Sequence, residues 1–182
     1  MSFIRKHWSN LLFAVLVLLL IVPQTGKPIK IYLHQLLAFS PSIKEESKRT
    51  KIESYDWVLV DSHGQKIDFN SFKGKKIVVN FWATWCPPCI AEMSSFQQLY
   101  DEFNEDVVFL FVTNDDEETV KHFLTQRKLH LPVYHEVTSP FPEFEGNNLP
   151  TTFIVNENQE IVVKKKGSAD WYSEEVRDLL RE

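Results

Sequence analysis

Residues 78–93 read VVNFWATWCPPCIAEM, and they contain Cys86 and Cys89, the two cysteines of the chain. The β-branched and aromatic residues before them form a short apolar run of the kind found in strands buried on both faces. Apolar residues then recur at spacings of three and four, as in an amphipathic helix: Ile90, Met93, Phe96, Leu99, Tyr100 and Phe103. The stretch therefore predicts a buried strand followed by a helix that begins at the cysteine pair.

The composition fits one globular domain with an additional segment. The chain has 182 residues, of which 43% are hydrophobic and 13% aromatic, enough for a substantial core. Residues 1–40 carry four basic side chains and no acidic one, so residues 41–182 carry a net charge of −9. Such an acidic body argues against a nucleic acid as partner.

The N-terminal segment predicts a membrane anchor, because Leu11–Val22 is an uninterrupted apolar run. A run of this length suits either a transmembrane segment or the apolar region of a cleaved signal peptide. We favour an uncleaved signal anchor over residues 1–26, since no A-x-A-like cleavage site follows. Arg5 and Lys6 then place the N-terminus in the cytoplasm and the body on the extracytoplasmic (periplasmic) side of the cell membrane, as a single-pass protein.

Residues 27–51 fit an amphipathic stalk and a polar linker, and the folded domain is predicted over residues 52–182. Within that domain the pattern predicts, in order, a β-hairpin, a strand, a helix, a strand, a helix, a short strand, a second hairpin and a C-terminal helix capped by Ser173. This order predicts an α/β fold with a central mixed β-sheet and helices on both faces.

The position of the cysteines predicts redox chemistry. An exposed thiol at a helix N-terminus has a lowered pKa, because unpaired N–H groups and the helix dipole stabilise its thiolate. Cys86 is therefore the expected nucleophile: it attacks a substrate disulfide, and Cys89, one turn deeper, resolves the mixed disulfide. A purely structural disulfide is a weaker interpretation, since so short a loop constrains the unfolded chain little.

Metal binding and peroxide reduction fit the pattern less well. A structural zinc site usually takes four ligands, and the histidine candidates His130 and His135 flank an apolar strand, where structural histidines are common. A peroxide-reducing cysteine would sit in a pattern resembling P-x-x-x-T-x-x-C, but Thr84 stands two residues before Cys86 instead of three. We therefore expect no metal, and no cofactor other than the redox-active disulfide Cys86–Cys89.

The sequence NFWATWCPPC, followed by LPTTFIV, resembles the thioredoxin superfamily, and more narrowly its TlpA/ResA-like branch of membrane-anchored extracytoplasmic thiol–disulfide oxidoreductases. The resemblance covers about residues 53–182 and implies a thioredoxin-like fold. It also implies a cis peptide bond at Pro150, next to the cysteines, and an exposed backbone at Leu149 that pairs with an extended substrate segment. Pro87 and Trp85, the latter expected at the surface, complete the implied substrate-binding residues.

In this branch a glutamate three residues after the second cysteine lies near the active site, and Glu92 holds that position. The resemblance implies that Glu92 accepts a proton from Cys89 as the mixed disulfide resolves; the alternative is a solvated helix glutamate. Thioredoxins carry a buried aspartate where this chain has Asn80, which cannot take a proton. Ser94 and Ser95 stand where family members often have a helix-kinking proline, which leaves the helix geometry there open.

The stretch from Val112 to Pro150 is longer than a minimal thioredoxin needs and resembles the βα insertion of the TlpA/ResA-like branch. We expect Phe141, Phe144 and the loop after them to border the active site and to help select the substrate. Trp82 matches an aromatic position of the family that can equally belong to the core.

The direction of electron flow is predicted from Pro87 and Pro88. Neither offers a backbone N–H to a Cys86 thiolate, which should raise the pKa of that thiol and make the pair more reducing. The resemblance also implies a reductase of protein disulfides, with apocytochrome c among the substrates and a membrane-embedded thiol as electron donor. Two alternatives stay open: a disulfide oxidase or isomerase on the same fold, and a non-enzymatic copper-binding or delivery domain.

Overall fold

The computed structural model describes residues 13, 31, 39–144 and 148–182. The predicted anchor at residues 1–26, Phe13 apart, and most of the predicted stalk lie outside the described residues. Among those that are described, no helix is both long and apolar enough to cross a membrane. The anchor, the stalk and the domain boundaries therefore stay predictions.

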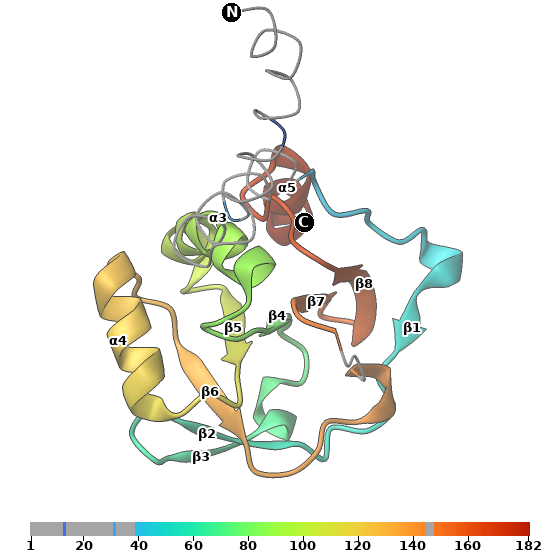
Figure 1. Cartoon of the computed structure of the whole chain (residues 1–182). Coiled ribbons are helices and arrows are strands. Elements are labelled where there is room, and N and C mark those ends of the chain that lie inside the picture. The colour runs from blue at the N-terminus through green and yellow to red at the C-terminus, as the bar shows by residue number, and fades with distance from the viewer. Residues whose placement is uncertain (1–12, 14–30, 32–38, 145–147) are drawn as a thin grey trace, which may run out of the picture.

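The described residues form one eight-stranded sheet with the order β1-β8-β7-β4-β5-β6-β2-β3 (Figure 1). Its strands are β1 (Thr50–Lys51), β2 (Val58–Asp61), β3 (Lys66–Asp68), β4 (Lys76–Phe81), β5 (Val107–Val112), β6 (Val133–Glu136), β7 (Thr151–Val155) and β8 (Glu160–Lys166). Strands β4, β5 and β6 run parallel, whereas the other neighbouring pairs are antiparallel. The predicted mixed sheet is confirmed, and β5 and, apart from Lys76 and Asn80, β4 consist of apolar residues because both of their faces are covered.

Three α-helices pack on one face of this sheet (Figure 1): α3 (Pro87–Phe103), α4 (Glu117–Arg127) and α5 (Glu174–Arg181). They share one core with the strand residues of that face, which we call the helix-side core. Within the described residues no α-helix covers the other face, so the prediction of helices on both faces is wrong for this part of the chain. The connections β4–α3–β5 and β5–α4–β6 add strands in the same direction across the sheet, and right-handed crossovers then place both helices on the same side.

The opposite face of the sheet is covered by loops and two 3₁₀ turns, η2 (Phe69–Phe72) and η3 (Pro142–Phe144). Ile77 and Val79 alternate along β4 with the residues of the helix side and reach this second core. We call it the aromatic core, because neighbouring ring centroids lie 4.4–6.2 Å apart among Tyr55, Trp57, Phe69, Phe141 and Phe144.

Part of the predicted linker joins the fold. Thr50 and Lys51 form β1, which pairs with the start of β8. The Lys44 N–H donates to the Val162 carbonyl at 2.8 Å, and Ile52 is buried in the aromatic core. The chain before residue 52 therefore closes one edge of the sheet.

The start of α5 differs from the prediction in one detail. Ser173 stands at the N-cap position, but its side chain makes no capping hydrogen bond. Its carbonyl instead accepts the first helical bond, from the Arg177 N–H at 3.1 Å. The helix is present as predicted, whereas the capping by the Ser173 hydroxyl is not.

Candidate active site

The cysteine pair forms a disulfide at the start of α3. Cys86 is the N-cap residue of the helix, and Pro87 and Pro88 are its first two residues. Since neither proline has an N–H, the capping bond to the Cys86 sulfur comes from the third position, where the Cys89 N–H donates at 3.3 Å. The motif thus places one sulfur at the helix N-terminus and leaves it a single amide donor from the first three residues.

The two sulfur-bearing residues differ little in exposure. Cys89 is fully buried, as expected of a resolving thiol, but Cys86 is also only 4% exposed. The expectation of an exposed Cys86 is therefore wrong for the disulfide form. Its sulfur is bonded to that of Cys89, and both residues belong to the helix-side core. A substrate must reach this sulfur at the surface of that core.

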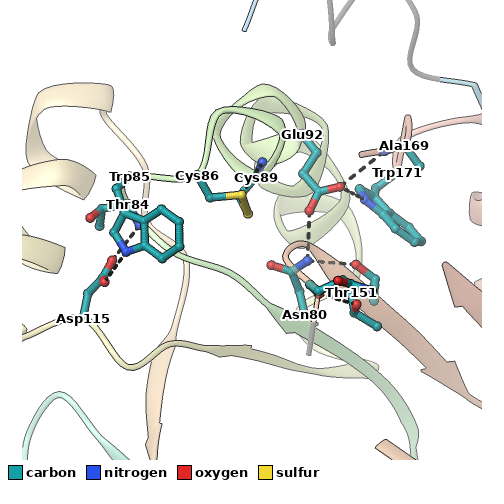
Figure 2. The surroundings of a disulfide bond; sticks show 12 residues. Asn80, Thr84, Trp85, Cys86, Cys89, Glu92, Asp115, Thr151, Ala169 and Trp171 are labelled. Atoms are coloured by element: carbon teal, nitrogen blue, oxygen red, sulfur yellow. Dashed lines mark hydrogen bonds between the residues drawn. A yellow bond between two sulfur atoms is a disulfide. The ribbon is translucent and has the colours of Figure 1, made fainter. Parts of the chain in front are cut away.

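Glu92, one turn further along α3, is buried and fully hydrogen-bonded (Figure 2). Its Oε1 accepts from Asn80 Nδ2 at 2.9 Å. Its Oε2 accepts from the Trp171 indole N–H at 2.8 Å and from the Ala169 backbone N–H at 3.3 Å. The solvated helix glutamate that the sequence left open is excluded, because the carboxyl group is enclosed between α3, β4 and the segment before α5.

Burial dominates the titration of this carboxyl group. It raises the pKa of Glu92 from 4.5 to about 8, because a charge is poorly solvated in the interior. The bonds from Trp171, Asn80 and Ala169 oppose the shift, since they favour the ionised form, and Lys165 adds a weaker electrostatic effect in the same direction. A carboxyl group with such a pKa can take up or release a proton near neutral pH.

The three partners of Glu92 come from two other parts of the chain, β4 and the segment after β8, and sequence analysis missed the two partners in the second part. Trp171 and Ala169 follow β8 and give no local signal, although a buried tryptophan needs an acceptor for its indole N–H. Ser95 adds a further link: its hydroxyl donates to the Glu92 carbonyl at 2.8 Å and accepts from the Trp171 backbone N–H at 3.2 Å. Helix α3 runs without a break past Ser94 and Ser95, which answers the question left by the missing proline.

A groove of about 320 Å³ lies beside the turn that leads into α3. Trp85, which is 66% exposed, and Leu149, which is 36% exposed, contribute apolar surface to it. Asp115 fixes this turn, because its carboxylate accepts from the Thr84 N–H at 2.6 Å and from the Trp85 indole N–H at 3.1 Å (Figure 2). Glu136 also lines the groove, and burial raises the pKa of its carboxyl group.

The substrate-binding residues implied by the resemblance occupy the same end of the sheet. The Leu149–Pro150 peptide bond is cis, as predicted. Pro150 is buried, and its carbonyl accepts from the Gly167 N–H at 2.9 Å. Leu149 and Trp85 line one groove, and Pro87 is half-buried on the first turn of α3. Their role in substrate binding stays a prediction.

Two other predicted borders of the site lie elsewhere. Phe141 and Phe144 are 5% and 0% exposed in the aromatic core, so their predicted place beside the cysteines is wrong. Rings of this size gain more from burial against Tyr55 and Trp57 than from a place at an open groove. Of the loop that follows them, residues 145–147 lie outside the described part of the chain. Trp82 belongs to the helix-side core, where its ring lies 5.3 Å from that of Phe123.

Metal ligands do not gather in the parts of the chain that the structure describes, where no group of three His, Cys, Asp or Glu side chains could hold an ion. His135 bonds through Nδ1 to the Thr113 carbonyl at 3.0 Å, as a structural histidine would. The expected absence of a metal and of a further cofactor stays a prediction.

The profile of the AhpC/TSA family matches residues 53–164, more than half of the chain. The chain belongs to the AhpC/TSA family. Its relatives include the thiol-disulfide oxidoreductase ResA of Bacillus cereus, which is 32% identical over 177 residues, covering 96% of this chain and 94% of the relative. Sporulation thiol-disulfide oxidoreductase A of Bacillus subtilis is 29% identical over 145 residues, covering 76% of this chain and 87% of the relative.

Solved structures share the fold. StoA from Bacillus subtilis superposes with a TM-score of 0.53 at 27% identity, covering 68% of this chain and 92% of that chain. A secreted disulfide oxidoreductase of Mycobacterium tuberculosis, described as homologous to DsbE of E. coli, superposes with a TM-score of 0.59 at 20% identity, covering 70% and 97%, and shows the fold alone. The AhpC/TSA family member described here is therefore a thiol–disulfide oxidoreductase of the thioredoxin-like fold, and the resemblance to the TlpA/ResA-like branch is confirmed.

Proposed function

We propose that the protein reduces disulfides of extracytoplasmic proteins, with Cys86 as the attacking and Cys89 as the resolving thiol. The observation that carries this proposal is the first turn of α3, where Pro87 and Pro88 leave the Cys89 N–H as the donor to the Cys86 sulfur. A thiolate with fewer donors is less stabilised, which favours the disulfide form and hence electron donation to the substrate.

The reaction transfers two electrons in two steps. The Cys86 thiolate attacks one sulfur of the substrate disulfide, a mixed disulfide forms, and the first substrate thiolate leaves. Cys89 then loses its proton and attacks the Cys86 sulfur. The second substrate thiolate leaves, and the Cys86–Cys89 disulfide seen in the structure is the oxidised product.

Glu92 supports the second step as a proton acceptor. Cys89 is fully buried, so its proton needs an acceptor inside the protein when the thiol becomes a nucleophile. Glu92 lies one turn further along the same helix, and its pKa of about 8 is close to that of an ordinary thiol. The carboxyl group can therefore take the proton without a large cost in free energy.

We assign substrate docking to the groove beside the turn that leads into α3. Trp85 and Leu149 offer exposed apolar surface there, and Pro87 directly follows Cys86 as the first residue of α3. Because the Pro150 carbonyl already bonds to the Gly167 N–H, backbone pairing with an extended substrate falls to Leu149. These four residues would hold the substrate disulfide over Cys86.

The proposal also covers the location and the electron source. The apolar run at residues 11–22 supports an uncleaved anchor with the catalytic domain on the extracytoplasmic side of the cell membrane. A reductase in that compartment needs a membrane-embedded thiol carrier to reduce its own disulfide after each turnover. Reduction of apocytochrome c for cytochrome c maturation would fit such a chain.

A cysteine trap tests the proposal. In Cys89→Ser the mixed disulfide cannot be resolved, so we expect substrate proteins to stay bound to Cys86 and to be released by a chemical reductant. The matched control is the double variant with Cys86→Ser, which should trap nothing. Identification of the captured proteins by mass gives the substrate, and the redox potential against glutathione gives the direction. No captured partner, or a potential near about −120 mV as in strong oxidases, would overturn the reductase assignment.

A further inference from the structure

The amide of Asn80 is buried and is hydrogen-bonded at its nitrogen end only. Asn80 is 0% exposed on β4. Its Nδ2 donates to Glu92 Oε1 at 2.9 Å and to Thr152 Oγ1 at 2.8 Å, so both amide hydrogens are used. Its Oδ1 is also buried, yet within the described residues it has no hydrogen-bond partner.

A buried acceptor without a partner is costly, and few native residues keep one without a reason. In the structure both hydrogens of the amide nitrogen are donated, to Glu92 Oε1 and to Thr152 Oγ1, so the nitrogen end faces these two residues. Asn80 Oδ1 must then point away from Glu92. Figure 2 shows it on the side of Cys89, whose sulfur lies in the same core on the first turn of α3.

We propose that Asn80 Oδ1 accepts a hydrogen bond from the Cys89 thiol in the reduced protein. In the disulfide the Cys89 sulfur is bonded to Cys86 and carries no proton, so it cannot donate a hydrogen bond to Asn80 Oδ1. Reduction adds two electrons and two protons, and the proton on Cys89 supplies the missing donor. The inference deepens the proposed function, because it rests on Cys89 as the resolving thiol.

The hydrogen bond makes Asn80 a positioning residue for that thiol. It holds Cys89 in the protonated form while Cys86 attacks the substrate, since the bond is lost when Cys89 ionises. Through Nδ2 the same amide donates to Glu92 Oε1, so Asn80 positions both the Cys89 thiol and the carboxyl group that accepts its proton. The amide itself carries no proton, and it stabilises the dithiol form of the protein relative to the disulfide.

The S–H stretching band in the infrared spectrum tests the bond directly. In the full chain with Cys86→Ala, the single S–H belongs to Cys89, and a hydrogen bond lowers and intensifies its band. We expect a lowered frequency in this variant, a return to the free-thiol position when Asn80→Leu is added, and no change when Thr152→Val is added instead. Thr152→Val is the matched control, because it removes a partner of Nδ2 and leaves Oδ1 in place.

Two results would overturn the inference: a free-thiol band with Asn80 present, or a lowered band that persists in the folded Asn80→Leu protein. If Asn80→Leu does not fold, the test is the NMR chemical shift of the Asn80 side-chain carbonyl carbon, measured in the unaltered chain. Its resonance should move downfield on reduction, and an unchanged resonance contradicts the bond. These spectra need no substrate, so their failure is distinct from a failure of the cysteine trap.

The redox equilibrium gives a second readout that a merely structural role would not produce. Loss of the bond removes stabilisation from the dithiol form, so Asn80→Leu should favour the disulfide in equilibrium with glutathione by about three- to tenfold, the latter being about 30 mV. Thr152→Val should shift it less. A shift toward the dithiol form in Asn80→Leu would contradict the inference.

Discussion

The two faces of the sheet are built from similar residues but differ in function. The aromatic core packs Trp57, Phe69 and Phe144 into a set of ring contacts around one side of the sheet. The helix-side core contains comparable rings, such as Phe96 stacked on Trp171 at 5.0 Å, but it also encloses Glu92. The comparison teaches that aromatic content marks packing on both faces, whereas the buried polar groups mark the face where the chemistry takes place.

The difference has an electrostatic cause. A carboxyl group in an apolar interior costs free energy unless it is neutral or well hydrogen-bonded. The helix-side core accepts this cost for Glu92 and supplies three donors, from Asn80, Trp171 and Ala169. Variants on the two faces should therefore separate stability from activity.

The largest effect is expected from the aromatic core. Phe144→Ala should lower the free energy of unfolding by about 3–5 kcal/mol, because it removes a fully buried ring and leaves a cavity. Disulfide exchange with a small substrate should keep its rate in the protein that stays folded. Urea unfolding and an exchange assay measure the two effects, with Phe39→Ala, at a 75% exposed site, as the control. If Phe144→Ala left the free energy of unfolding unchanged but altered the substrate preference, Phe144 would belong to the active site.

The second effect concerns stability as a function of pH. Because burial raises the pKa of Glu92 to about 8, the folded protein keeps this proton between pH 4.5 and about 8, where the unfolded chain has released it. The contribution of Glu92 to the free energy of unfolding is therefore greatest below pH 4.5, and it is lost as the pH rises toward 8. We expect the difference in stability between the unaltered chain and Glu92→Gln to change by a few kcal/mol across this window. A difference that does not depend on pH would show that Glu92 titrates normally.

The third effect is on the rate of disulfide reduction. Glu92→Gln should slow turnover about 100-fold near neutral pH, at the lower end of what a positioned acid or base contributes. Glu102→Gln is the matched control, since that carboxylate lies on the same helix but binds Arg181 and Tyr172 at the surface. Insulin reduction measured from pH 6 to 9 compares them. Equal rates in the two variants would remove Glu92 from the mechanism.

The smallest effect is expected at the groove. Asp115→Ala removes a charged acceptor from the Thr84 N–H and the Trp85 indole, which should cost about 1–3 kcal/mol of stability. The loosened turn should raise KM for protein substrates and leave exchange with a small disulfide nearly unchanged. Glu118→Gln, on the exposed side of α4, serves as the control. A larger loss with the small disulfide would place Asp115 in the chemistry of Cys86 itself.

Local patterns in the sequence predicted most of the architecture. The apolar run before Cys86 and the spacing after it gave the strand and helix that carry the disulfide, because both depend on neighbours in the chain. The family resemblance added the cis bond at Pro150, which composition and periodicity do not reveal. The aromatic residues Phe141 and Phe144 were misplaced, since an apolar ring in a loop fits a groove or a core equally well until its neighbours are known.

The sequence alone determined that a thiol pair stands at a helix N-terminus with two prolines between the sulfurs, since these features lie within a few covalent bonds of one another. Only the tertiary structure decided the environment of Glu92. Its partners, Asn80 and Trp171, lie 12 and 79 residues away in the chain. Burial depends on which segments pack together, and the pKa of Glu92 is raised because that packing removes the surrounding water.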